Sequence, residues 1–137
     1  MPRGVRTVVF DSWAALAYLE DEPAAEAVAD LIADARERQA SLLMTVVTAG
    51  EVWYITARES SVADAERALD KLQELGCRFV DVDLPLTRAA AAFKAKHRMA
   101  YADCFAAALA KREKAELVTG DREFKQVEEE LHLKFLG

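Results

Sequence analysis

The chain has 137 residues, 53% of them hydrophobic and 31% charged, which supports one buried core and is too short for two ordinary domains, so we expect a single domain over residues 1–137. This composition excludes a disordered or low-complexity chain, and no apolar run reaches the roughly 18 residues that a membrane span needs. The net charge of −6 opposes binding to a nucleic acid, for which lysine and arginine normally supply the affinity.

In the N-terminal half, apolar periodicity predicts two strands and four helices. The first six residues contain no signal-peptide core, so we expect a soluble cytoplasmic protein. The strands are expected at residues 7–10 and 42–47, and the second is almost entirely apolar, as is typical of a strand covered on both faces. The helices are expected at residues 12 to about 20, from residue 23 onward, at 48 to about 58, and at 61–75.

In the C-terminal half, strands and helices continue to alternate. We expect strands at residues 78–82, 116–119 and 133–136, and helices at residues 86 to about 98, 102–114 and near 123–131. Alternation of this kind is the signature of an α/β domain whose sheet is mainly parallel. The sequence therefore predicts an α/β fold, a three-layer α/β/α sandwich with a mainly parallel central sheet.

Four acidic residues occupy equivalent places in this layout. Asp11 follows the first strand, Glu51 lies just inside the helix after the second, Asp103 is in the first turn of an alanine-rich helix, and Asp121 follows the fourth strand. The carboxyl ends of parallel strands converge on one edge of a sheet, where ligands bind. Clustered carboxylates repel one another unless a cation neutralises them, and an all-oxygen cluster favours Mg²⁺ or Mn²⁺ over zinc.

Each acid also has an alternative explanation as a helix cap, because carboxylates accept hydrogen bonds from the free N–H groups of a first turn. The segment from Thr48 to Glu51 even fits a capping box, in which Glu51 would reach back to Thr48. Taken singly, each acid is as consistent with capping as with a site. Four together, each among small or apolar neighbours, favour a shared site.

Four segments resemble the motifs of the PIN domain family in order and spacing: VVFDS at residues 8–12, TAGEV at 48–52, ADCFAAALA at 102–110 and LVTGDREF at 117–124. The resemblance covers essentially the whole chain, and the small size is most similar to VapC toxins of VapBC toxin–antitoxin pairs. It implies a metal-dependent endoribonuclease. By the same resemblance Asp11, Glu51, Asp103 and Asp121 form the acidic site, with Ser12 and Thr119 as its hydroxyl neighbours.

The mechanism that the resemblance implies uses one or two Mg²⁺ (or Mn²⁺) ions to activate water against an RNA phosphodiester. Asp11 and Asp103 are expected to be the most direct ligands, with Glu51 and Asp121 completing the site directly or through water. Two bound ions would reduce the formal charge of −6 to about −2, which answers part of the charge problem.

The implied partners are an RNA substrate, a VapB-like antitoxin and a second copy of the chain in a homodimer, with no membrane. Arg98, Arg122 and Lys125 are candidate phosphate contacts, although ordinary solvated surface also explains them. Trp53 and Tyr54 are candidates for the homodimer interface or for a groove that receives the antitoxin.

Other functions are weighed against this one. A PIN nuclease of RNA processing or decay that has no antitoxin is an alternative, and a non-catalytic PIN binding module is a third. A phosphoacceptor receiver domain would need a pair of acids after the first strand, whereas Asp11 is followed by Ser12. The glycines form no nucleotide-binding loop, and no Gly-x-Ser-x-Gly hydrolase motif is present.

Overall fold

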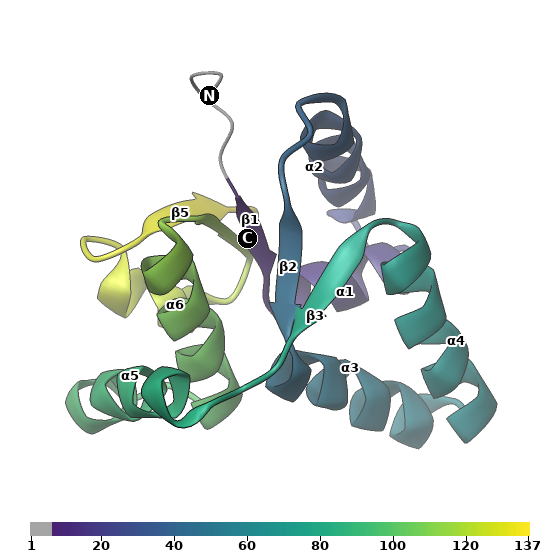
Figure 1. The fold of residues 1–137 in the computed structure, drawn as a ribbon. Coiled ribbons are helices and arrows are strands. Elements are labelled where there is room, and N and C mark those ends of the chain that lie inside the picture. Colours follow the sequence, from purple (N-terminus) through teal and green to yellow (C-terminus); the bar gives the residue numbers. More distant parts are fainter. Residues whose placement is uncertain (1–6) are drawn as a thin grey trace.

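The computed structural model describes residues 7–137, which form a five-stranded sheet with helices on both faces (Figure 1). The first six residues, on which the expectation about a signal peptide depends, lie outside this range. Neighbouring strands are parallel throughout, in the order β3-β2-β1-β4-β5. The predicted three-layer sandwich is therefore confirmed, and the sheet is parallel without exception among the described strands.

The sheet places the first and fourth strands of the chain side by side. Its strands are β1 (Val8–Phe10), β2 (Leu42–Thr45), β3 (Cys77–Val80), β4 (Glu116–Thr119) and β5 (His132–Phe135). The central strand, β1, pairs with β2 on one side and with β4 on the other, where Phe10 is opposite Val118. The residues that follow β1 and β4 consequently emerge next to each other at the carboxyl edge of the sheet.

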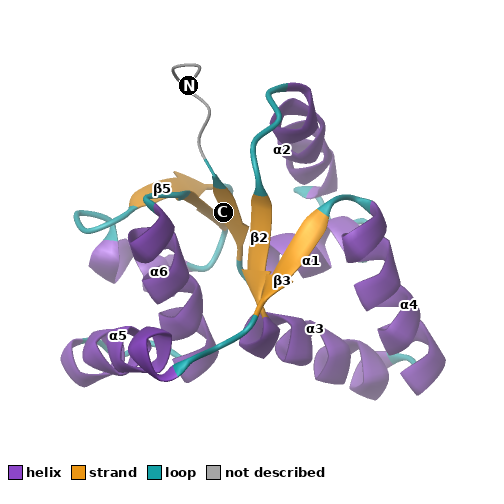
Figure 2. Cartoon of the chain, in the orientation of Figure 1, coloured by secondary structure: helices purple, strands orange, loops and turns teal. Residues whose placement is uncertain are grey.

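Two groups of helices cover the two faces of the sheet (Figure 2). The helices are α1 (Ser12–Leu19), α2 (Ala25–Glu37), α3 (Val46–Glu59), α4 (Val62–Glu74), α5 (Leu84–Lys96), α6 (Tyr101–Glu113) and the 3₁₀ helix η1 (Arg122–Val127). Alternate strand residues point to opposite faces, so Val9 packs with α5, α6 and η1, whereas Val8 packs with the helices α1 to α4. Among the described residues, no helix is both long and apolar enough to cross a bilayer.

The boundary between β2 and α3 differs from the prediction. The strand expected at residues 42–47 ends at Thr45, and Val46 and Val47 belong to the helix. The reason is a cap that the apolar run conceals: the Thr45 side chain accepts a hydrogen bond from the backbone N–H of Thr48 (3.0 Å) and starts the helix there. The expectation that this strand is covered on both faces is confirmed, because all four of its residues are buried.

Two other helices begin at different residues from those predicted. The second helix, α2, starts two residues later than expected. The helix α5 starts two residues earlier, at Leu84, because Asp83 Oδ1 accepts the Leu86 N–H (2.9 Å) and caps it. The boundaries of the remaining α-helices lie within one or two residues of the prediction, which is the ordinary uncertainty of helix ends.

The helix expected near residues 123–131 is shorter and of a different kind, since η1 is a 3₁₀ helix that ends at Val127. Its two buried side chains, Phe124 and Val127, are three residues apart, which matches the three residues per turn of this helix. Leu131, the last residue of the predicted helix, lies beyond the end of η1 and is half-buried. This short element starts directly after Asp121, which is its N-cap, and contains Glu123.

Candidate active site

Asp11 is buried at the carboxyl end of the central strand, with 1% of its surface exposed. It is the N-cap of α1, where its Oδ1 accepts the backbone N–H of Ala14 (2.9 Å). Burial raises the pKa of Asp11 to about 7, because the charged carboxylate loses its hydration. The nearby carboxylates of Asp121 and Glu51 raise it further. Asp11 is therefore both a helix cap and a member of an acidic cluster.

Asp103 lies in the first turn of α6 and is also buried, with 7% of its surface exposed. Burial raises the pKa of Asp103 to about 8, and the charge of Asp11 is the second cause. A hydrogen bond with Glu123 and the charges of Asp121 and Glu51 raise it further. Since Asp11 and Asp103 each respond to the same other acids, the fold has brought together carboxylates from four separate segments.

Thr119 connects two of these acids through one buried hydroxyl. Its Oγ1 donates a hydrogen bond to Asp11 Oδ2 and accepts one from the backbone N–H of Asp121 (3.0 Å). Asp121 in turn is the N-cap of η1, with its Oδ1 accepting the Glu123 N–H (2.9 Å). Thr119 thus lies beside two of the acids, as expected.

Glu51 does not have the capping role that the sequence allowed. The N-cap of α3 is Thr45, and Glu51 lies six residues further along, in the second turn of the helix. The Thr48 N–H and hydroxyl are both bonded to Thr45 Oγ1, at 3.0 and 3.1 Å. The capping-box prediction is therefore wrong, because the helix starts one turn earlier than the box requires. Glu51 is half-buried, and its charge acts on both Asp11 and Asp103.

Glu123 is a fifth acid of the cluster, and it was not among the residues predicted from the sequence. One carboxylate oxygen each from Asp103, Asp121 and Glu123 lies within 4.8 Å of the others, a spacing at which three side chains could hold one metal ion. Glu123 Oε1 also accepts the backbone N–H of Ala100 (3.0 Å), just before α6. Its position two residues after Asp121, in the same short motif, was the signal available in the sequence.

The other predicted site residues are carried by α1, by η1 and by the segment before α6. Ser12 is the half-buried first residue of α1, and Arg98 and Arg122 are exposed just before α6 and at the start of η1. Lys125 forms an ion pair with Glu128 (3.8 Å), and its Nζ lies 4.2 Å from the centre of the Phe135 ring. The Lys125 ammonium group consequently has partners within the protein.

The donor set fits a hard divalent cation. The acids of the cluster offer only carboxylate oxygens, which such ions prefer. The nearest sulfur in sequence, Cys104, is buried, and burial raises the pKa of its thiol, so it offers no thiolate to a softer metal. Two buried carboxyl groups with raised pKa values also need either protons or a cation to be stable together.

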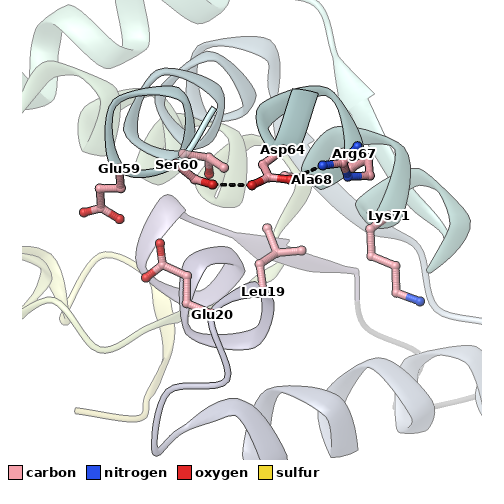
Figure 3. Close-up of a pocket in the computed structure, with 9 residues that line it drawn as sticks. Leu19, Glu20, Glu59, Ser60, Asp64, Arg67, Ala68 and Lys71 are labelled. Atoms are coloured by element: carbon pink, nitrogen blue, oxygen red, sulfur yellow. Dashed lines mark hydrogen bonds and ion pairs between the residues drawn. The ribbon is translucent and has the colours of Figure 1, made fainter. Parts of the chain in front are cut away.

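A separate cavity of about 320 Å³ lies between the C-terminal ends of α1 and α3 and the face of α4 (Figure 3). Its wall has acidic side chains on one side, where the carboxylates of Glu20 and Glu59 face each other, and basic ones on the other, Arg67 and Lys71. None of the clustered acids lines this cavity. It is thus distinct from the carboxylate site.

Comparison with known proteins identifies both a family and a set of similar structures. Residues 8–130 match the family model described as the PIN domain. VapBC2 from Rickettsia felis, solved with a DNA fragment from its promoter, has a TM-score of 0.76 at 16% identity, with 96% of this chain and 99% of that chain covered. VapBC from Salmonella typhimurium, also solved bound to DNA, has a TM-score of 0.73 at 15% identity, with 95% and 98% covered.

A third similar structure is that of a toxin. VapC20 from Mycobacterium tuberculosis, a toxin that cleaves the sarcin-ricin loop, has a TM-score of 0.70 at 16% identity, with 88% of this chain and 95% of that chain covered. No curated protein matches the chain. At these identities the structures establish a shared fold over nearly the full length of both chains.

Proposed function

The chain belongs to the PIN domain family, and from this premise we propose that it is a divalent-metal-dependent endoribonuclease, the toxin of a VapBC-type pair, acting in the cytoplasm. The observation that carries the proposal is the convergence of buried Asp11 and Asp103 with further acids at the carboxyl edge of the sheet. Such burial of like charges costs free energy that a purely structural site would have no reason to bear.

We assign Asp11 and Asp103 as direct ligands of Mg²⁺ or Mn²⁺, with Glu51, Asp121 and Glu123 completing the site. A divalent ion bound there would lower the pKa of a water molecule and neutralise charge on the scissile phosphate. Thr119 orients Asp11, since its hydroxyl donates to the oxygen that does not cap α1. Ser12, at the start of the same helix, is the second hydroxyl that we assign to a supporting role.

The proposed substrate is RNA. Arg122 follows Asp121 in the chain, and the backbone of Arg98 is bonded to Gln126 of η1. Both arginines are exposed, and we expect their guanidinium groups to contact phosphates. Lys125 is a weaker candidate, because its ammonium group already interacts with Glu128 and Phe135. The net charge of −6 remains unfavourable for RNA binding without the metal, so we expect binding and cleavage to depend on the same ions.

The proposed protein partner is a VapB-like antitoxin. A groove of about 680 Å³ between α1 and α2 is mainly apolar, with Trp13 and Leu16 among the residues that line it and Glu20 and Glu22 as its acidic ones. Glu20 also borders the cavity of Figure 3. Apolar surface next to several carboxylates fits an amphipathic antitoxin segment that carries basic side chains.

We also propose a homodimer, in which Trp53 and Tyr54 of α3 are candidate interface residues. Tyr54 is 43% exposed, and the guanidinium of Arg58 lies 5.0 Å from the centre of its ring. Exposed aromatic and arginine side chains are enriched in protein interfaces. Light scattering of the purified chain measures the oligomeric state.

The test of the nuclease is the substitution Asp11→Asn. Asparagine keeps the N-cap of α1 but cannot supply the charge that binds the metal. We expect cleavage of RNA with Mn²⁺ to fall by more than about 100-fold, beyond the usual loss when only a supporting residue of a metal site is changed. The melting temperature of the variant checks that it is folded. Cleavage by purified, folded Asp11→Asn protein at the wild-type rate would refute the assignment.

The toxin role has its own test, which separates it from a PIN nuclease without an antitoxin. Expression of the wild-type chain alone should arrest growth, and the Asp11→Asn chain should not. Co-expression of the small open reading frame upstream of the gene should restore growth if that frame encodes the antitoxin. Cleavage in vitro without growth arrest would favour the nuclease of RNA processing or decay.

A further inference from the structure

The segment that joins α5 to α6 is fixed by side chains from other elements. The N-cap of α6, Ala100, has no side chain that can cap the helix, although this helix carries Asp103 in its first turn. The backbone around it is bonded instead to η1, which follows β4 and opens with Asp121 as its cap. These hydrogen bonds therefore connect the segment that precedes Asp103 with the helix that follows Asp121.

Gln126 makes two hydrogen bonds of this set, both to the backbone of one residue. Its Oε1 accepts the backbone N–H of Arg98 (3.1 Å), and its Nε2 donates to the backbone carbonyl of the same residue (3.0 Å). One amide side chain therefore pairs with both the backbone N–H and the backbone carbonyl of Arg98, as a neighbouring strand would. The Nε2 group also donates to the Glu123 carbonyl (3.1 Å), which orients the amide on η1.

Two further hydrogen bonds hold the same segment. Glu123 Oε1 accepts the N–H of Ala100 (3.0 Å), and Lys94 Nζ donates to the carbonyl of Met99 (2.6 Å). In a capping box the acid at the third helical position would bond to the N-cap N–H, and in α6 that position is Asp103. Because Glu123 takes that bond, the Asp103 carboxylate is left to the cluster.

The helix η1 is itself well anchored, because Phe124 and Val127 are completely buried in the core beneath α6. A rigid element can hold the residues bonded to it in fixed positions, whereas a mobile element cannot. We propose that Gln126 is a positioning residue of the metal site: by holding Arg98 against η1, it sets the approach of Asp103 to Asp121. This inference rests on the proposed metal-dependent nuclease and adds a residue that touches neither metal nor substrate.

The experiment compares Gln126→Ala with the wild-type chain by calorimetric titration of Mn²⁺ into metal-free protein. We expect the affinity for Mn²⁺ to fall about 5-fold, the effect that loss of ordinary hydrogen bonds produces. Gln126→Met, which keeps the length of the side chain but neither polar group, should give the same loss. The matched control is Gln73→Ala, which removes an exposed glutamine from α4 and should leave the affinity unchanged.

Two more measurements separate positioning from general stability. Thermal unfolding of the metal-free variants identifies the temperature range in which all are folded, and the titrations are done there. At saturating RNA, where a weaker phosphate contact by Arg98 no longer limits the rate, cleavage by Gln126→Ala should return to the wild-type rate as Mn²⁺ is raised, because the defect lies in metal occupancy. Wild-type affinity in folded Gln126→Ala protein would overturn the positioning role and leave the nuclease intact. A wild-type chain that binds no Mn²⁺ would overturn the metal site and this inference together.

Discussion

At the scale of single residues, Thr119 connects two of the acids through one hydroxyl. It is fully buried, and its hydroxyl uses its one proton on Asp11 and a lone pair on the Asp121 N–H. The hydrogen bond to Asp11 favours the charged form and so opposes the effect of burial on the pKa of this acid. A single hydroxyl thus favours the ionised form of one acid and fixes the backbone of another.

We therefore expect Thr119→Val to impair the site although it keeps the shape of the side chain. Asp11 would lose a buried hydrogen bond and the Asp121 N–H a partly buried one, which should lower the free energy of unfolding by about 1 to 3 kcal/mol. The affinity for Mn²⁺ should fall about 10- to 100-fold, because Asp11 loses the group that orients it. Titration and denaturant unfolding measure the two effects. Thr119→Ser, which keeps the hydroxyl, should recover most of the affinity, and equal losses in both variants would contradict this account.

The acids also show that capping and site membership are not exclusive. Asp11 uses Oδ1 to cap α1 and Oδ2 to meet Thr119, so one carboxylate has both roles. Glu51, in contrast, takes no part in capping, because the N-cap of α3 is Thr45. A sequence identifies which residues are able to cap a helix, but the actual cap depends on where the preceding strand ends.

At the scale of elements, the loop after β4 is held by contact between a glycine and an indole ring. A Cβ added at Gly120 would lie 2.2 Å from Cζ2 of Trp13, which is in the first turn of α1. The Trp13 ring therefore packs directly on the backbone between Thr119 and Asp121. This contact joins the start of α1, whose N-cap is Asp11, to the backbone between Thr119 and Asp121.

Gly120→Ala should consequently destabilise the protein by about 1 to 3 kcal/mol, the usual cost of overpacking, and should weaken Mn²⁺ binding by displacing the loop. The control is Gly50→Ala, in a helix and with no atom within 4 Å of the added Cβ, which should stabilise the protein by about 0.5 to 1 kcal/mol. Denaturant unfolding compares them. A stable Gly120→Ala variant with wild-type metal affinity would show that the ring moves aside without cost.

The elements themselves were largely predictable, whereas the connections between them were not. Apolar periodicity located all five strands, and the alternation of strands with helices indicated that they run parallel. The errors lie at boundaries set by one side chain, such as Thr45 and Asp83. Glu123 and Gln126 were missed because their partners, 23 and 28 residues away in the chain, become neighbours only when η1 packs beneath α6.

At the scale of the whole molecule, the fold concentrates negative charge in a place where it is poorly solvated. An aspartate in water has a pKa of about 3.8, whereas the pKa values of Asp11 and Asp103 rise to about 7 and about 8 in the folded protein, with burial as the main cause. The folded, metal-free protein therefore binds protons that the unfolded chain has already released near neutral pH. Protons and divalent ions compete for the same carboxylates, which couples stability, pH and metal.

Without metal, the folded protein should become less stable as the pH rises. A pKa that is higher in the folded state means that the stabilising effect is complete below about pH 4 and is lost as the pH rises toward 7 for Asp11 and 8 for Asp103. The melting temperature of the metal-free protein should hence fall by several degrees between about pH 5 and pH 8. Saturating Mn²⁺ should remove this fall, because the ion binds the folded state and binds it more tightly when the carboxylates are deprotonated.

Asp11→Asn isolates the contribution of one group, since asparagine does not titrate. The fall in melting temperature with pH should be smaller in this variant than in the wild type, and the metal-free variant should be the more stable of the two near pH 8. Asp64, whose pKa is lowered chiefly by its hydrogen bonds with Ser60 and Arg67, acts in the opposite direction, but only below about pH 4. Equal pH profiles for wild type and Asp11→Asn would mean that Asp11 is already ionised in the folded, metal-free protein.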